Sequence, residues 1–395
     1  MSTTIILKEI KYRRRKNLVS QGEGKKIISI QRDINIENIL DRKLIKTNLN
    51  DIGDYINNEV VLVTGGGGSI GSEICRQVSK LNPKQLIILD NYENNAYEIQ
   101  QELLRKYKDE LNLKIVIASI RDKKRMDNIF KKYNPKIIFH AAAHKHVPLM
   151  EDDPSEAIKN NIFGTLNLVR LADKYKAKNF VLISSDKAVN PTSIMGATKR
   201  VAEMIAQSIS ENSETKFACV RFGNVFGSNG SVIPLFKKQI SEGGPITVTH
   251  PDMVRYFMTI SEAVGLVINA GAISSGGEVF VLDMGMPIKI LDLAKKIIRL
   301  SGFIPEKDIK IKFIGLRPGE KLYEEILMQE EVVEKTKNNK IFISKAVKFD
   351  KSKLDSNIKK LEKIIDEDGD MISIIKDIVP NYMKGEVDEK YSVNN

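Results

Sequence analysis

The chain has 395 residues, of which 42% are hydrophobic and 29% charged, with two cysteines. These values are typical of a globular protein with one large or two ordinary domains, and they exclude a disulfide-rich secreted domain. No apolar run approaches the roughly 18 residues of a membrane helix, and the start has no signal-peptide pattern. We therefore expect a cytoplasmic protein with no transmembrane segment and with Cys75 and Cys219 reduced.

The net charge of +11 raises the possibility of a nucleic-acid partner. The lysines are scattered, however, and no basic stretch alternates with the aromatic residues that single-strand binders use for stacking. We expect no nucleic acid, and a lysine-rich surface around an anionic, diphosphate-bearing ligand instead.

Residues 1–58 form an expected N-terminal arm that packs on the domain or on a neighbouring subunit, and we expect a homo-oligomer. Within the arm, the basic cluster at 11–16 leaves a membrane-surface role open as an alternative.

The sequence from Val60 to Gly71 reads VVLVTGGGGSIG and organises the chain. A β-branched run predicts a buried parallel strand at 60–64, and the stretch after the glycines has helical character. Gly65, Gly68 and Gly71 lie in the turn between strand and helix, where glycine lets backbone amides and the helix dipole approach a pyrophosphate. A second strand at 85–90 ends in Asp90, at the position of a ribose-binding carboxylate.

Alternating strand and helix patterns then predict a Rossmann-type α/β fold, a doubly wound parallel sheet at residues 59–228. The further strands are expected at 113–118, 136–140, 179–184 and 216–222, and the helices at 96–107, up to 133, at 154–175 and at 196–210. A smaller α/β substrate-binding domain is expected at 229–330, with helices near 232–242, 261–272 and 290–301. Some of its elements are expected to return to the Rossmann core. Residues 331–395 read as a charged extension with a helical stretch near 351–365.

Ser185, Asp186 and Lys187 follow the fifth strand, and Lys199 comes twelve residues later. With the glycine loop, this arrangement resembles the extended short-chain dehydrogenase/reductase family, which carries a Tyr-x-x-x-Lys pair on the following helix. Here Met195 replaces the tyrosine, so the usual phenolic base is missing.

A closer resemblance is to the nucleotide-sugar dehydratases of polysaccharide biosynthesis, and more narrowly to UDP-N-acetylglucosamine 4,6-dehydratases. It covers about residues 35–330 and rests on GGGGSIGS at 65–72, HAAAHKHVPLME at 140–151, SSDKA at 184–188, RFGNV at 221–225 and RPGEKL at 317–322. The methionine at position 195 resembles the branch that retains the C5 configuration and supplies bacillosamine-type and legionaminic-type sugars.

The resemblance implies a hydro-lyase that converts UDP-N-acetylglucosamine to a 4-keto-6-deoxy product in a redox-neutral elimination. It implies Asp186 as the acid at C6 and Lys187 as the base at C5, whose pKa would need to be lowered for work near neutrality. Ser185 is expected to bond the sugar 4-hydroxyl, Met195 to line the site without proton chemistry, and Lys199 to bond the nicotinamide ribose.

The other expected site residues fall into two groups. Those expected at the cofactor are Gly65, Gly68, Ser69, Ile70, Gly71, Asp90, Asn91, Ser119, Ile120, Ala141, Ala142, Ala143, Lys145, Asn161 and Lys199. Those expected at the substrate are His144, Lys145, Arg221, Asn224, Ser231, Val232, Arg255, Arg317 and Glu320. The three arginines are candidates for the UDP diphosphate, although each could equally form a structural ion pair.

The cofactor expected is NAD rather than NADP, because a carboxylate at Asp90 would repel a 2′-phosphate. No metal is expected, since His140, His144 and His146 lack further ligands for zinc. Two other functions stay open: a UDP-sugar epimerase, which would usually keep the tyrosine, and a catalytically silent Rossmann protein that senses NAD. A dehydratase that inverts C5 is a further alternative.

Overall fold

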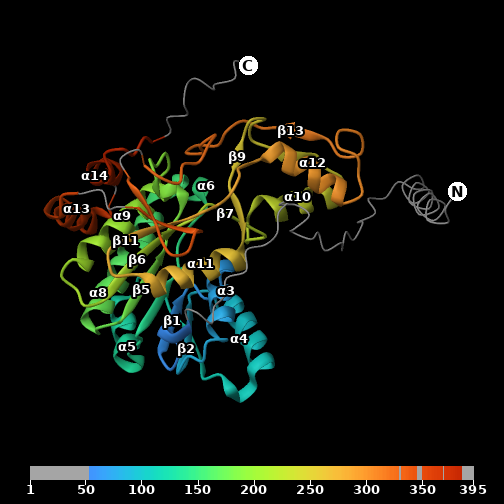
Figure 1. Cartoon of the computed structure of the whole chain (residues 1–395). Helices are drawn as coiled ribbons and strands as arrows, with labels where there is room; N and C mark the ends of the chain where they lie inside the picture. Colours follow the sequence, from blue (N-terminus) through green and yellow to red (C-terminus); the bar gives the residue numbers. More distant parts are fainter. Residues whose placement is uncertain (1–52, 329–330, 345–348, 368, 385–395) are drawn as a thin grey trace.

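The computed structural model describes residues 53–328, 331–344, 349–367 and 369–384. Most of the expected N-terminal arm, including the basic cluster, lies outside these residues. The described chain forms a larger lobe around a long sheet and a smaller lobe that carries α10, α12 and β13 (Figure 1). No helix in these ranges is long and apolar enough to cross a bilayer.

The larger lobe is built on a nine-stranded sheet with the order β14-β15-β11-β6-β5-β4-β1-β2-β3. From β3 to β11 all neighbours are parallel, which confirms the expected doubly wound Rossmann sheet. The strands are β1 (Val60–Thr64), β2 (Gln85–Asp90), β3 (Leu113–Ile117), β4 (Ile137–His140), β5 (Asn179–Ile183), β6 (Lys216–Arg221), β11 (Glu278–Leu282), β14 (Val333–Lys335) and β15 (Ile341–Ser344).

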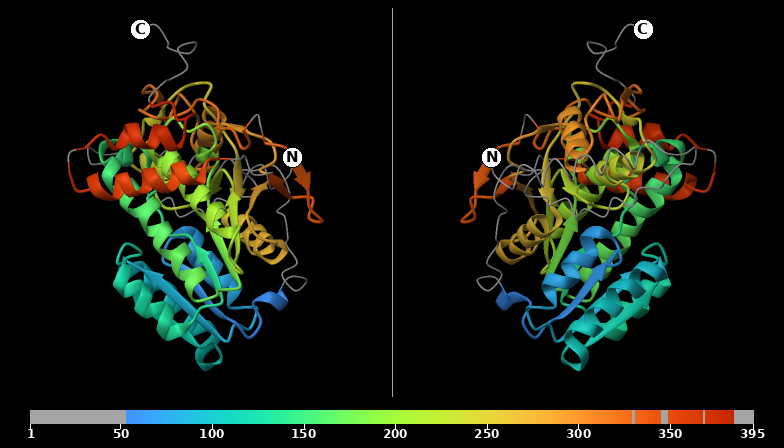
Figure 2. Two further views of the ribbon diagram at one scale, coloured as in Figure 1. Left: turned by 90° about the vertical axis from the view of Figure 1, so that its left-hand side faces the viewer. Right: turned by 90° about the vertical axis from the view of Figure 1, so that its right-hand side faces the viewer.

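Helices cover both faces of this sheet, because its strands are apolar on both sides. One face packs against α5 (Lys123–Tyr133), α8 (Thr165–Lys174) and α9 (Ile194–Ser210), and α13 (Lys351–Ile364) and α14 (Met371–Ile378) form a further layer outside them. The other face packs against α3 (Ser69–Val78), α4 (Glu93–Tyr107) and α11 (Ile260–Ile273). The red helices α13 and α14 lie against the green helices of the first face (Figure 2).

The predicted long helix at 154–175 is divided into three parts. It starts as α7 (Pro154–Ala157), widens into a π-helix, η3 (Ile158–Gly164), and continues as α8. In the widened part the Thr165 hydroxyl donates to the Asn161 carbonyl oxygen at 2.7 Å. A π-helical segment is frequent at functional sites because it re-aims side chains, and this one carries Asn160 and Asn161.

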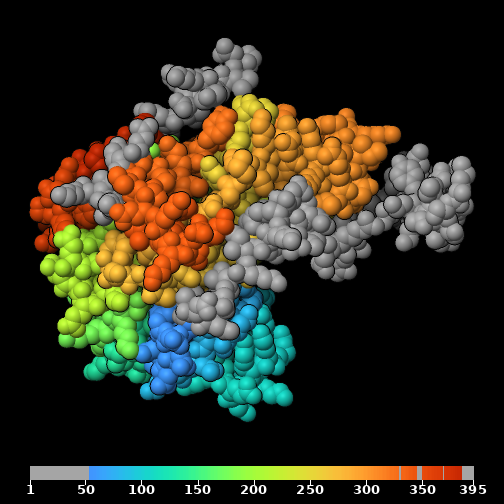
Figure 3. Space-filling model, in the orientation of Figure 1, coloured from blue at the N-terminus to red at the C-terminus, as the bar shows by residue number. Residues whose placement is uncertain are grey.

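The C-terminal part contributes more than the expected charged extension. Its helical stretch is present as α13, but two strands also extend the sheet: β15 pairs antiparallel with β11, and β14 pairs antiparallel with β15. In the space-filling view the orange surface accordingly runs from the smaller lobe onto the larger one (Figure 3).

The smaller lobe has its own apolar core, centred on Phe236 and Ile297. It comprises α10 (Val232–Ser241), α12 (Ile290–Leu300) and paired short strands: β7 (Asn224–Phe226) with β10 (Phe257–Thr259), β8 (Ile246–Val248) with β13 (Ile311–Phe313), and β9 (Val254–Arg255) with β12 (Ile288–Lys289).

A buried ion-pair network joins the sheet to its C-terminal edge. The fully buried Arg221 guanidinium, at the end of β6, contacts both oxygens of Glu203 from α9 at 2.7 Å and both oxygens of Glu331 at 2.8 Å. Burial alone would raise the pKa of Glu203, but Arg221 and Arg200 lower it to about 2. The Glu203 carboxylate is therefore ionised, and Arg221 is bound by two carboxylates of the protein itself.

Arg221→Met should lower the free energy of unfolding by about 3–5 kcal/mol, because it leaves the buried Glu331 without its cation and Glu203 with Arg200 alone. Urea denaturation followed by circular dichroism measures this. The matched control is Glu362→Gln, which removes the exposed pair with Lys123 and should cost about 0–1 kcal/mol. Equal small losses in both variants would contradict the structural role of Arg221.

Candidate active site

The turn between β1 and α3 is built around close backbone contacts. A Cβ on Gly71 would lie 2.0 Å from the Gly65 carbonyl oxygen, and Gly65 itself has a φ of 65°, so side chains are excluded at both positions. Among the described residues no side chain caps the start of α3 at Gly68. First-turn amides at an uncapped helix N-terminus are donors for an anion, so the turn fits a dinucleotide pyrophosphate.

Asp90 lies beside this turn, at the end of β2. Its Oδ2 accepts from the Gly67 amide at 2.8 Å and its Oδ1 from the Tyr92 amide at 2.9 Å. These two bonds hold the carboxylate against the glycine turn, in the position from which a ribose hydroxyl is bonded in Rossmann sites.

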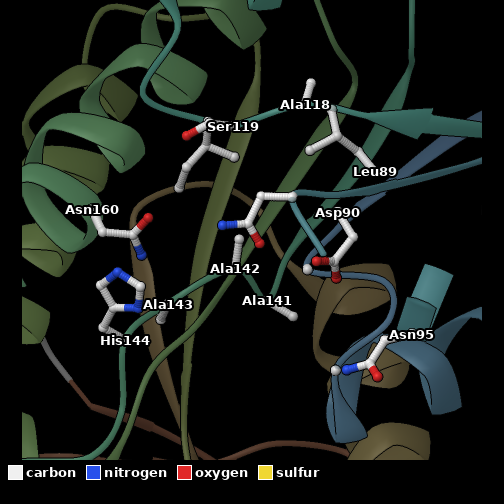
Figure 4. A pocket seen from close by; sticks show the side chains of 14 residues that line it. Leu89, Asp90, Asn95, Ala118, Ser119, Ala141, Ala142, Ala143, His144 and Asn160 are labelled. Carbon is white, nitrogen blue, oxygen red and sulfur yellow. The ribbon is translucent and has the colours of Figure 1, made fainter. Parts of the chain in front are cut away.

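A cavity at the carboxyl ends of the strands collects most of the expected cofactor residues (Figure 4). Its lining comprises Gly65, Gly68, Leu89, Asp90, Asn91, Asn95, Ala118, Ser119, Ile120, Ala141, Ala142, Ala143, His144 and Asn160. Leu89, Asn95, Ala118 and Asn160 are additions that the sequence analysis missed. Asn160 comes directly before Asn161, an expected cofactor residue, in the π-helix η3. The wider turn determines which of the two side chains faces the cavity, and the sequence alone does not show it.

Other expected cofactor residues build the surroundings instead. Ser69 accepts a hydrogen bond from the Asn229 amide at 3.0 Å, and Ile70 packs on the apolar core. The Asn161 side chain bonds both backbone groups of His144 and the Thr198 hydroxyl, so it fixes the loop after β4. Lys145 donates to the Asn229 carbonyl oxygen at 2.9 Å. Asn229 thus links the smaller lobe to two elements of the cofactor side.

Ser185, Asp186 and Lys187 follow β5, next to β4 and the alanines of the cavity. The Ser185 hydroxyl donates to Asp186 Oδ1 at 2.8 Å, and Lys187 Nζ donates to the same oxygen at 3.1 Å. Asp186 is 1% exposed, and its Oδ2 is buried with no hydrogen-bond partner among the described residues. Burial raises the pKa of Asp186, which favours its acid form.

The expectation of a lowered pKa for Lys187 is wrong. Burial does lower it, but the carboxylates of Asp186 and Glu324 outweigh burial and raise the pKa of Lys187 above its ordinary value. Glu324 Oε1 lies 3.0 Å from Lys187 Nζ. Glu324 was missed because it is one glutamate in the charged stretch after RPGEKL, 137 positions away in sequence.

Lys199 is buried on α9 and donates to the Ile183 carbonyl oxygen at 2.6 Å. Burial lowers the pKa of Lys199 to about 8. Met195, one turn earlier, is 3% exposed and belongs to the apolar core of that face. A thioether there offers packing only.

The three histidines have different surroundings. His140 lies between the hydroxyls of Thr64 and Thr165 at 2.8 and 2.9 Å, and burial lowers its pKa to about 3, so it is a neutral structural residue. His144 lines the cavity with its Nε2 3.0 Å from Arg121. His146 packs against Gly230, where an added Cβ would lie 2.5 Å from its ring.

Two of the three arginines expected at a diphosphate are engaged elsewhere. Arg221 is closed off in the ion-pair network described above, so its predicted role is corrected to a structural one. Arg255 is buried and donates to the carbonyl oxygens of Val254, Lys321 and Leu322. Arg317 is exposed, and its amide donates to Glu320 at 3.1 Å.

The expected nucleotide contacts lie where the smaller lobe begins. Asn224 donates to the Tyr256 carbonyl oxygen through its side-chain nitrogen at 3.4 Å. Ser231 and Val232 form the N-terminus of α10, and the Ser231 hydroxyl is buried with no partner among the described residues. An unsatisfied hydroxyl at a helix N-terminus is suited to a phosphate oxygen.

Known proteins are similar to this chain in sequence and in fold. The family model described as "Polysaccharide biosynthesis protein" matches residues 61–346. The chain is 52% identical to the capsular polysaccharide biosynthesis protein CapD of Staphylococcus aureus over 86% of its own length, and it spans only 57% of that relative's length.

Two further comparisons concern activity and structure. The chain is 33% identical to a UDP-N-acetylglucosamine 4,6-dehydratase (inverting) of Campylobacter jejuni, over 68% of this chain and 77% of the relative. The X-ray structure of Pen from Bacillus thuringiensis superposes with a TM-score of 0.68 at 39% identity, covering 73% of this chain and 88% of that one.

Proposed function

The chain belongs to the polysaccharide biosynthesis protein family, and on this premise we propose that it dehydrates UDP-N-acetylglucosamine across C4 and C6 with retention at C5. Relatives of the chain include a UDP-N-acetylglucosamine 4,6-dehydratase (inverting) and a UDP-glucose 4-epimerase of Rickettsia bellii. The observation that supports dehydration is the Ser185–Asp186–Lys187 cluster beside a dinucleotide-type cavity. It supplies an acid and a base from adjacent residues.

A nicotinamide bound in the cavity would accept hydride from C4 of the sugar and return it to C6. Asp90 supports NAD for this role, because its charge opposes a 2′-phosphate. The glycine turn and the uncapped start of α3 suit the pyrophosphate.

The proton balance of the reaction matches the geometry of Ser185 and Asp186. The C4 hydroxyl loses a proton when C4 becomes a ketone, and the C6 hydroxyl needs one to leave as water. Asp186 must begin this step as the ionised carboxylate: the Ser185 hydroxyl can then accept the first proton while it donates its own to Asp186, 2.8 Å away. Asp186, with a raised pKa, can then protonate the leaving hydroxyl. One proton therefore serves both ends of the reaction.

Lys187 has the second task. Because its pKa is raised, the neutral amine is the minor form of Lys187 at neutral pH. In that form it would remove the C5 proton, which the C4 ketone has acidified, and return that proton after water has left. Return to the same face by the same residue gives retention at C5. The packed thioether of Met195 takes no part, which also argues against an epimerase that relies on tyrosine in this position.

The nucleotide would lie along the smaller lobe. Ser231 at the start of α10, the exposed Arg317 and the half-buried Glu320 support a UDP site there. Two of the expected phosphate ligands, Arg221 and Arg255, have no part in it.

The protein should convert UDP-N-acetylglucosamine to a product lighter by one water, with no net NADH. Mass spectrometry of the nucleotide sugar and absorbance at the NADH band measure both, and NMR of the product reports its C5 configuration. NADH formed in proportion to product, without loss of water, would indicate a dehydrogenase. A change at C4 alone would indicate an epimerase.

Asp186→Asn and Lys187→Ala should each lower turnover by about 10²-fold or more, the usual effect of losing an acid–base group. Affinity for the nucleotide sugar should change far less, because neither residue is assigned to UDP. Ser185→Ala should lower turnover too if it carries the C4 proton. Near-normal turnover in any variant would reject the role given to that residue.

Asp90→Ala should weaken NAD binding by about 1.5–3 kcal/mol, the value of a hydrogen bond to a charged group, and should improve binding of NADP. Asp90→Asn is the matched variant, since it keeps an acceptor without the charge. Calorimetric titration of both dinucleotides measures the change. A wild-type protein that already binds NADP more tightly would overturn the assignment.

A further inference from the structure

Glu324 is a buried carboxylate that reaches the acid–base cluster from a segment far along the chain. It lies in the segment between β13 and β14, and its side chain is 2% exposed. Its Oε1 lies 3.0 Å from Lys187 Nζ and 3.6 Å from Arg255 Nε. Its Oε2 is buried with no hydrogen-bond partner among the described residues.

Four charged groups from four elements face Lys187. Asp186 precedes it in the short helix η4 (Asp186–Ala188), Glu324 comes from the segment after β13, Arg255 from β9, and Lys145 from the loop after β4. Burial raises the pKa of both carboxyls, but the neighbouring cations Lys187 and Arg255 bring that of Glu324 below its ordinary value, whereas that of Asp186 stays raised. Glu324 is therefore the more persistent anion beside the ammonium.

We propose that Glu324 is a positioning residue that holds the Lys187 ammonium by an ion pair and so determines the pH at which Lys187 becomes a free amine. What that amine does rests on the proposed function, but the ion pair does not. In the reaction, the same contact would hold the proton taken from C5 on Lys187 until it returns to carbon.

A purely architectural role for Glu324, as an anchor of Arg255, fits the contacts less well. Arg255 already donates to three carbonyl oxygens of its own surroundings, so it is fixed without Glu324. Glu324 Oε1 also lies closer to Lys187 Nζ, at 3.0 Å, than to Arg255 Nε, at 3.6 Å. Lys187 has fewer alternatives: among the described residues its Nζ forms ion pairs with Asp186 and Glu324.

The test measures the titration of Lys187 itself, without any sugar. Competitive labelling with acetic anhydride across a pH series, read by peptide mass spectrometry, gives the pH at which Lys187 is half reactive. In Glu324→Gln this midpoint should move to lower pH by about 1–3 pH units, because the isosteric amide removes one adjacent negative charge. An unchanged midpoint overturns the proposal.

Two further variants make the result specific. Glu325→Gln alters the next residue, which is half exposed and bonds Lys321 and Asn190, and it should leave the midpoint unchanged. Glu324→Asp keeps the charge but withdraws it by one methylene, so it should move the midpoint less and in the same direction. If Glu324→Gln does not fold, an unmoved midpoint in Glu324→Asp overturns the proposal on its own.

Turnover gives a second, separable measurement. With UDP-N-acetylglucosamine as substrate, the rise of kcat with pH should move to lower pH in Glu324→Gln, with little change in KM. If the wild-type protein forms no dehydrated sugar, the proposed function fails while the labelling result still decides the ion pair. A kcat profile unchanged in Glu324→Gln, in an active enzyme, would overturn the role of Glu324 in the reaction.

Discussion

The carboxylate of Glu203 is the point on which the site depends. It accepts from Ser184, immediately before the acid–base cluster, at 2.6 Å, and from Arg221 at the end of β6. Arg200, on the same helix, donates to it as well. Because all these groups are buried, none can be solvated if a partner moves. The loop after β5 is therefore fixed to the helix that carries Lys199.

Burial acts in opposite directions on the groups of the site. It favours the neutral form of each, so it raises the pKa of the Asp186 carboxyl and lowers that of the Lys199 ammonium. Lys187 departs from this pattern because two carboxylates lie within hydrogen-bond distance. The pKa values of Asp186 and Lys187, which are adjacent in sequence, therefore depend on their neighbours in space as well as on burial.

The sequence predicted best those features that depend on residues close together in the chain. The glycine spacing, the acid at the end of β2 and the alternation of strands and helices predicted the sheet and most of the cavity lining, because each depends on residues close together in the chain. Arg221 shows the limit: a guanidinium suits a diphosphate and a buried carboxylate equally, and its partner Glu331 is 110 positions away. Glu324 and the edge strands β14 and β15 were missed for the same reason.

The antiparallel edge of the sheet has a consequence for how the molecule meets its neighbours. A parallel sheet that ended at β11 would present unpaired amides and carbonyls to any extended chain. Here β15 pairs with β11, and the outermost strand, β14, has only three residues, of which Glu334 and Lys335 are charged and exposed. A strand so short and charged is a poor template for further pairing, so the same segment that supplies Glu331 to the interior also guards this edge of the sheet against pairing with another chain.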